Sequence, residues 1–251
     1  MAGILRVDQI QSTAGANVID VSSGSFKIWD GNSYENFTVS GALLSINTYT
    51  SQNGTWNSKS TSGGSGVWSK PSGCNHVLVY VTGGGGGVRC NDNQYRGAGG
   101  GGGATAIRYI DVSNVSSVNY TYGSGGGYAR NGGRGGTGGT SSFGSYCTAT
   151  GGQGGQTDNP HQGGPGGNAS GGDINIPGGG GEMSHGHNRE GGGGSSFWHK
   201  AGSSHHYYNN QEEITHGQWG SGGGYGYYSQ NSFAHNNCNG GAGCVIVYNY
   251  T

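Results

Sequence analysis

Aromatic and histidine side chains are the residues of this sequence best suited to chemistry, and they gather in four stretches between runs of glycine. These stretches are 88–96, 182–190, 195–219 and 225–239. Large aromatic side chains offer wide contact area at a low cost in side-chain entropy, and their faces suit sugar rings. We therefore expect the stretches to be recognition loops on a rigid scaffold. The expected contact residues are Asn93, Tyr95, His187, Phe197, Trp198, His199, His205, His206, Tyr207, Tyr208, Trp219, Tyr227, Tyr228, Phe233 and His235. The alternative is that the aromatics cap the glycine segments and fill a small end core.

Paired histidines raise a second possibility, a transition-metal site. His185 and His187 are separated by one residue, and His205 and His206 are adjacent, so their imidazoles could share an ion, within one chain or across symmetry-related chains. Ordinary polar loop residues are the alternative, and we expect no bound metal and no cofactor.

Signatures of enzymes are missing from the sequence. It contains no Gly-Lys dipeptide, which a phosphate-binding P-loop needs, and no His-Glu pair, which a zinc-protease helix needs. The adjacent Glu212 and Glu213 have no identifiable third group. We therefore expect binding without bond-making and no enzymatic activity.

Composition excludes several partners. The net charge of −1 gives no reason to expect nucleic acid, and no apolar run approaches the ~20 residues that span a bilayer. Residues 1–7 do not form a secretory signal, so synthesis in a cytoplasm is expected. Five cysteines form no C-x-x-C pair, and we expect Cys147 and Cys244 to be small buried apolar residues.

Glycine dominates the chain from residue 83 onward. There are 61 glycines in 251 residues, against a usual share of about 7%. The stretches 132–140, 151–156 and 163–168 read Gly-Gly-X. A helix with three residues per turn places every X on one edge and leaves two bare faces for neighbouring backbones. We expect Gly-Gly-X runs at the surface, and pure glycine runs such as 99–103, 178–181 and 191–194 inside.

Strand signals bracket the glycine tract. Five strands are expected, at 42–50, 77–81, 104–112, 118–122 and 244–248. Leu44 and Ile46 should form the buried face of the first, and the second should be buried on both faces. The predicted fold is mostly β and irregular, with short strands flanking a packed bundle of left-handed polyglycine-II helices and essentially no α-helix.

Two domains are expected. Residues 1–40 are too few to bury a core of their own, so this arm should pack on the rest of the chain, oligomerise with copies of itself, or dock onto a larger assembly. Docking or oligomerisation is the expected role. Residues 41–251 should form the β-strand and polyglycine domain with its recognition loops.

Three characteristic segments follow one another along the chain. They are Trp68-Ser69-Lys70-Pro71-Ser72-Gly73 before the strand 77–81 and five glycines, Gly138-Gly139-Thr140-Ser141-Ser142-Phe143-Gly144 followed by Thr148-Ala149-Thr150-Gly151-Gly152, and the exit Gly240-Gly241-Ala242-Gly243-Cys244-Val245-Ile246-Val247-Tyr248. These three segments resemble the glycine-rich domains of bacteriophage tail proteins. Their order spans about residues 42–251. Ile4 to Gln11 also resembles the start of tail-fibre proteins of marine phages.

This resemblance implies a tail-fibre or tail-tip adhesin that binds an outer-membrane protein or polysaccharide of a bacterium. It further implies a place in the virion after synthesis in the host cytoplasm, attachment to other tail or fibre proteins through residues 1–40, and a homotrimer. The rival interpretations are a structural component of the tail or fibre that contacts no receptor, and an ice-binding polyglycine bundle.

Overall fold

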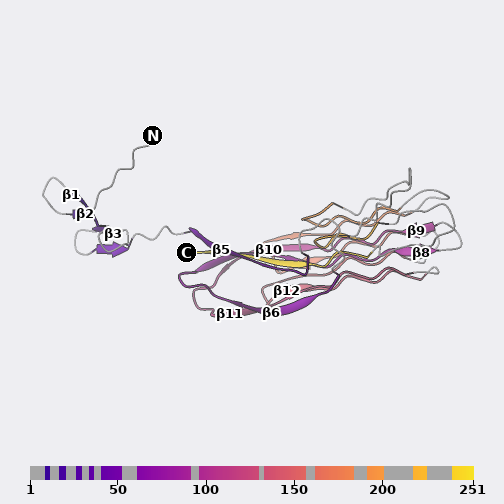
Figure 1. Ribbon diagram of the computed structural model, residues 1–251, viewed down its shortest axis with the longest axis horizontal. Coiled ribbons are helices and arrows are strands. Elements are labelled where there is room, and N and C mark those ends of the chain that lie inside the picture. The colour runs from indigo at the N-terminus through magenta and orange to yellow at the C-terminus, as the bar shows by residue number, and fades with distance from the viewer. Residues whose placement is uncertain are drawn as a thin grey trace, which may run out of the picture. The chain divides into compact units, whose positions relative to one another are not determined.

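The computed structural model describes residues 9–11, 17–20, 27–29, 34–36, 41–52, 61–91, 96–129, 133–156, 162–183, 191–200, 217–224 and 239–251. The chain divides into two compact units, Met1–Ala42 together with Thr251, and Leu43–Tyr250. The secondary structure across these ranges consists of strands, with no α-helix, as the sequence predicted (Figure 1).

The first unit contains one small antiparallel sheet. Its strands β1 (Gln9–Gln11), β2 (Asn17–Asp20), β3 (Lys27–Trp29) and β4 (Tyr34–Asn36) lie in chain order. Ile10 pairs with Ile19, which pairs with Ile28, so three isoleucines occupy one row across the sheet.

The second unit contains two five-stranded antiparallel sheets. The β7 sheet has the order β15 (Ile174–Ile176), β10 (Thr105–Asp111), β7 (His76–Thr82), β16 (Cys244–Tyr250) and β5 (Leu43–Tyr49). The β11 sheet has the order β14 (Ala169–Ser170), β13 (Cys147–Ala149), β12 (Ser141–Phe143), β11 (Ser117–Tyr122) and β6 (Gly64–Ser69). A separate pair is formed by β8 (Arg89–Asn91) and β9 (Arg96–Ala98).

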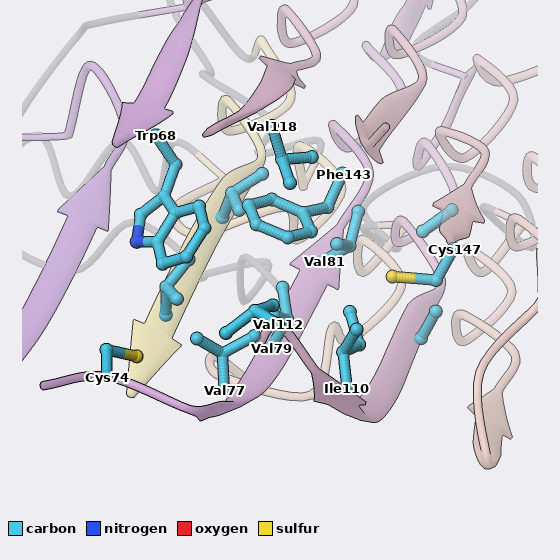
Figure 2. Packing of buried hydrophobic residues seen from close by; sticks show 14 of the residues in the cluster. Trp68, Cys74, Val77, Val79, Val81, Ile110, Val112, Val118, Phe143 and Cys147 are labelled. Atoms are coloured by element: carbon cyan, nitrogen blue, oxygen red, sulfur yellow. The ribbon is translucent and has the colours of Figure 1, made fainter. Parts of the chain in front are cut away.

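Side chains that alternate along the strands form a core between the two sheets (Figure 2). Val77, Val79 and Val81 of β7 are fully buried and face Trp68 and Phe143 from the other sheet. The Trp68 and Phe143 rings meet edge to face with centroids 5.8 Å apart. Burial of these apolar side chains supplies the main stabilisation of the sandwich, at roughly 25 cal/mol per Å².

All five expected strands are present, but two of their burial patterns were wrong. Residues 77–81 alternate: Leu78 and Tyr80 on the outer face are only half-buried, because the β11 sheet packs against the opposite face, which carries the valines. In β5 the expected burial is not found. Leu44 and Ile46 are exposed, and Ser45, which is exposed as well, accepts hydrogen bonds from the Asn249 side chain through its carbonyl and hydroxyl oxygens.

Eight of the ten glycine-rich segments in the described ranges adjoin a strand directly, and the ten together form what we call the glycine array. They are 83–88, 99–104, 123–129, 133–140, 150–156, 162–168, 177–183, 191–195, 220–224 and 239–243. Strands lead directly into the array or follow it; β7 continues into 83–88, for example, and 239–243 continues into β16. Figure 1 shows the array extending from the sheets as a bundle of near-parallel chains that reaches β8 and β9.

Backbone hydrogen bonds within the array repeat every three residues. In segment 83–88 the N–H groups of Gly83 and Gly86 donate to segment 99–104, and those of Gly84 and Gly87 donate to segment 133–140, over 2.8–3.0 Å. The carbonyls follow the same period toward other neighbours. Segments 83–88 and 99–104 are each bonded in this way to six neighbours, so the other eight segments enclose them. A repeat of three is what a helix with three residues per turn requires.

Burial along the array agrees in large part with the Gly-Gly-X prediction. Residues 83–87 and 99–103 are buried, and the X residues Arg134, Thr137 and Thr140 are exposed. The prediction was wrong for the pure glycine run 178–181, where Gly180 is exposed because its segment lies on the outside of the array.

Candidate functional site

One end of the array, which we call the far end, carries hairpin connections. There, β8 and β9 pair with Arg89 opposite Ala98 and Asn91 opposite Arg96. Isolated bridges tie this hairpin to its neighbours, from Arg89 to Ala129 and from Ala98 to Met183. The β8–β9 hairpin is thus linked at the far end to segments 123–129 and 177–183 of the array.

Three of the four expected recognition loops are attached at this far end. Loop 88–96 is the tip of the β8–β9 hairpin, and loops 182–190 and 225–239 each join an outgoing segment to a returning one. The Asn239 side chain closes the last connection by accepting a hydrogen bond from the Tyr128 N–H over 2.9 Å. The predicted contact residues of these loops lie outside the described residues. They are Asn93, Tyr95, His187, Tyr227, Tyr228, Phe233 and His235, together with the candidate metal ligand His185.

The fourth loop, 195–219, begins and ends at the opposite end, beside the β7 sheet. Its first turn is held by Ser196, whose hydroxyl donates to the Trp219 carbonyl over 2.7 Å and accepts from the His199 N–H over 3.1 Å. The His199 ring lies 3.4 Å from the Ser221 hydroxyl. Trp219 has a φ of 48°, and it is the one non-glycine residue with a left-handed backbone among those described. The next residue, Gly220, has a φ of 83°.

Phe197 and Trp198 pack on the outer face of the β7 sheet. The Trp198 ring lies 5.2 Å from the Tyr80 ring and 4.9 Å from the Phe197 ring, which it meets at 89°. Its indole N–H donates to the Thr82 hydroxyl over 3.0 Å, and Tyr248 completes the cluster at 5.8 Å from Tyr80. Trp198 is therefore an anchor for the turn, in agreement with the capping alternative, whereas Phe197 keeps 46% of its surface exposed.

The remaining members of the fourth loop fall outside the described ranges. These are His205, His206, Tyr207 and Tyr208. The described part of the chain contains no group of three or more potential metal-binding side chains. It also contains no helix capable of spanning a bilayer.

The cysteines whose side chains are described are buried thiols. Cys147 and Cys244 keep 2% and 0% of their surface exposed, so the expectation of small buried residues is confirmed. Burial raises the pKa of Cys147 to about 11 and that of Cys244 to about 12. Loss of hydration also raises the pKa of Cys74. These thiols are protonated at neutral pH, which suits packing and not nucleophilic chemistry.

Residues 58–250 match the family described as glycine-rich domain. The chain belongs to this family. The match includes the β11 sheet, four strands of the β7 sheet and every segment of the glycine array. A search of curated proteins found no match to this glycine-rich domain protein.

Sequence reasoning missed two residues of the aromatic cluster. Both lie in predicted strands: Tyr80 stands at an outward position between the inward Val79 and Val81, and Tyr248 stands between the inward Val247 and the buried Asn249. A strict period-two interpretation of 77–81 and 244–248 would have placed both tyrosines on the outer face.

Proposed function

We propose that this chain is a bacteriophage tail-fibre or tail-tip adhesin that binds a bacterial surface receptor, either an outer-membrane protein or a polysaccharide. The observation that carries the proposal is the far end of the array, where a backbone held by hydrogen bonds supports three connections. The first contains Tyr95, the second contains His185 and His187, and the third contains Tyr225, Tyr227, Tyr228, Phe233 and His235. Membership of the glycine-rich domain family and the resemblance to tail proteins support the proposal.

The scaffold part of the proposal is a bundle of polyglycine-II helices. The three-residue period of the hydrogen bonds and the close approach of neighbouring backbones both support this description. Such a scaffold holds the ends of its loops in place, so less ordering is needed when a receptor binds.

The proposed mechanism is binding without bond-making. The aromatic rings of the loops bury apolar or sugar faces of the receptor, and their histidines and asparagines supply hydrogen bonds. Attachment to the virion uses residues 1–40, and several copies on one particle multiply weak contacts.

Replacement of residues 226–237 by a Gly-Ser linker of equal length tests this proposal. Particles that carry the chain should still assemble and should contain the altered protein, but should lose adsorption to their host. Thr137→Ser and Pro165→Ser serve as controls because both sites are exposed on the side of the array, away from the loops. Unchanged adsorption after the replacement would contradict the far-end site.

A structural component of the tail is the second candidate function. The exposed apolar side chains of the β7 sheet favour it, since such side chains commonly mark contacts with other proteins. This candidate predicts that the same replacement leaves adsorption intact, or that it prevents assembly if the loops contact another tail protein.

A further inference from the structure

The outer face of the β7 sheet is apolar across its strands. The register aligns Ile46 of β5, Tyr248 of β16, Leu78 of β7 and Tyr109 of β10 in one row. Ile107 and Ile174 stand side by side in the next row. Ile46, Tyr109 and Ile174 keep 50%, 53% and 56% of their surfaces exposed. Strands of a sheet that met water on this side would carry polar residues at these positions.

The outer face of the β11 sheet provides the contrast within the same molecule. Its outward positions are polar, as at Ser65, Asn119, Thr121 and Ser142, and Val67 is the large apolar exception. The two sheets share one core, so the difference between their outer faces does not come from the demands of folding. The β7 sheet therefore has a surface built for a partner.

The described contacts within the chain cover one corner of this face. Phe197 and Trp198 pack against Tyr80, which in turn contacts Tyr248, at the end nearest the array. Ile46, Tyr109 and Ile174, further from that corner, remain half exposed. In the described part of the chain, the side chains beyond that corner therefore present apolar surface that a partner can bury.

We propose that this face docks on the same face of a second copy of the chain. β10, β7, β16 and β5 have seven residues each. With strands ~4.8 Å apart and a rise of ~3.3 Å per residue, they give a footprint of roughly 20 by 23 Å. Side chains that protrude from such a footprint bring its accessible surface near the ~800 Å² that each partner contributes to a standard interface.

Charge and symmetry also favour a second copy. The two apolar rows contain no charged side chain; Asp111 and His76 pair at the border of the face. The face can therefore meet its own copy without like-charge repulsion. A single self-complementary patch produces a two-fold dimer, whereas a ring of three needs two different complementary patches on each chain. The inference thus replaces the expected trimer by a dimer, and it does not depend on receptor binding.

Light scattering of the full-length protein over a concentration series tests the proposal. The wild-type protein should have twice the monomer mass of 25.4 kDa. Ile46→Glu should raise the dissociation constant of the dimer by about tenfold or more, since it buries a charge without a partner. The matched control is Val67→Glu, which places the same charge on the outer edge strand of the other sheet, where 56% of Val67 is exposed, and should leave the dimer intact.

The outcomes separate clearly. A wild-type monomer or trimer would overturn the proposal, and so would a dimer that Ile46→Glu leaves unchanged or that Val67→Glu weakens equally. Thermal unfolding of both variants shows whether the monomer fold is retained. If Ile46→Glu unfolds the chain, Ile46→Ser replaces it in the same comparison, because a serine at this exposed edge position also removes the apolar contact.

Discussion

At the residue scale, glycine is required in the array by its neighbours. A Cβ added to Gly102 would lie 2.1 Å from the carbonyl oxygen of Ser195, and one added to Gly101 would lie 2.0 Å from that of Pro165. The Gly-Gly-X spacing predicted this close approach. It could not show that the run containing Gly180 lies outside, because a run of four glycines has no side chain to mark an exposed edge. That position depends on which segments surround it.

Gly102→Ala and Gly180→Ala should therefore have opposite effects. The first forces a methyl group into backbone atoms that are packed on all sides, and should lower the free energy of unfolding by about 3 kcal/mol or more. The second meets nothing closer than the Gly164 oxygen at 3.9 Å, and should raise that free energy by about 0.4–1 kcal/mol because alanine loses less chain entropy. Urea unfolding measures both; equal destabilisation would refute the packed array.

The buried thiols predict a loss of stability at alkaline pH. Their ordinary pKa is 9.0 when exposed, whereas the folded-state pKa is about 11 for Cys147 and about 12 for Cys244 because of burial. Between pH 9 and these values the unfolded chain releases protons that the folded chain retains, so the free energy of unfolding falls as pH rises. The part of the free energy of unfolding that comes from the protonated thiols is fully retained below pH 9. Burial raises the pKa of Tyr49 and acts in the same direction.

Urea unfolding at pH 8, 9.5 and 10.5 should show this decline, and Cys244→Ala should make it shallower. Alanine keeps the site apolar and removes the ionisable group. If the slope with pH is the same in the variant, Cys244 does not ionise on unfolding in this range, and the assigned burial of its thiol is wrong.

At the element scale, the period of each strand could be predicted but the inward face of β5 could not. Leu44 and Ile46 alternate with Ser45 and Asn47, and the usual rule buries the apolar pair. The polar pair instead stands on the side of the buried Asn249 at the edge of the sheet, where Ser45 stays exposed and Asn47 is half-buried. The Asn249 amide nitrogen donates to both polar side chains, and its oxygen accepts from the Trp68 indole over 3.0 Å. A partner from the distant end of the chain is not visible in local sequence.

Asn249→Leu should lower the free energy of unfolding by about 2–3 kcal/mol, because it leaves the buried indole N–H of Trp68 without its acceptor. The matched variant Trp68→Phe removes that donor. If the hydrogen bond between the sheets matters, the double variant should be less destabilised than the sum of the two single variants by about 1 kcal/mol. A double-mutant cycle from chemical unfolding provides the measurement, and strict additivity would contradict the coupling.

At the scale of the whole molecule, the sheets and the array form one unit because the strands run directly into the glycine segments. Strands on both sides of the tract predicted this continuity. The distribution of the aromatic loops could not be predicted, since the direction of each segment decides it. Loop 195–219 begins at the sheets because segment 191–195 returns toward them and segment 220–224 leaves them again.

This continuity predicts that the array and the sandwich unfold together. The amides of Gly83 to Gly87 donate to neighbouring segments, so they should exchange with solvent as slowly as those of β7. A loss of about 3 kcal/mol in Gly102→Ala should then speed exchange about a hundredfold in β7 and β16 as well as in the array. Hydrogen exchange with fragment mass analysis of the intact chain measures both regions. Fast exchange across 83–103 in the wild-type protein would mean that the tract is a linker. A Gly102→Ala effect confined to the array would mean that the sandwich is stable on its own and that glycine only extends it.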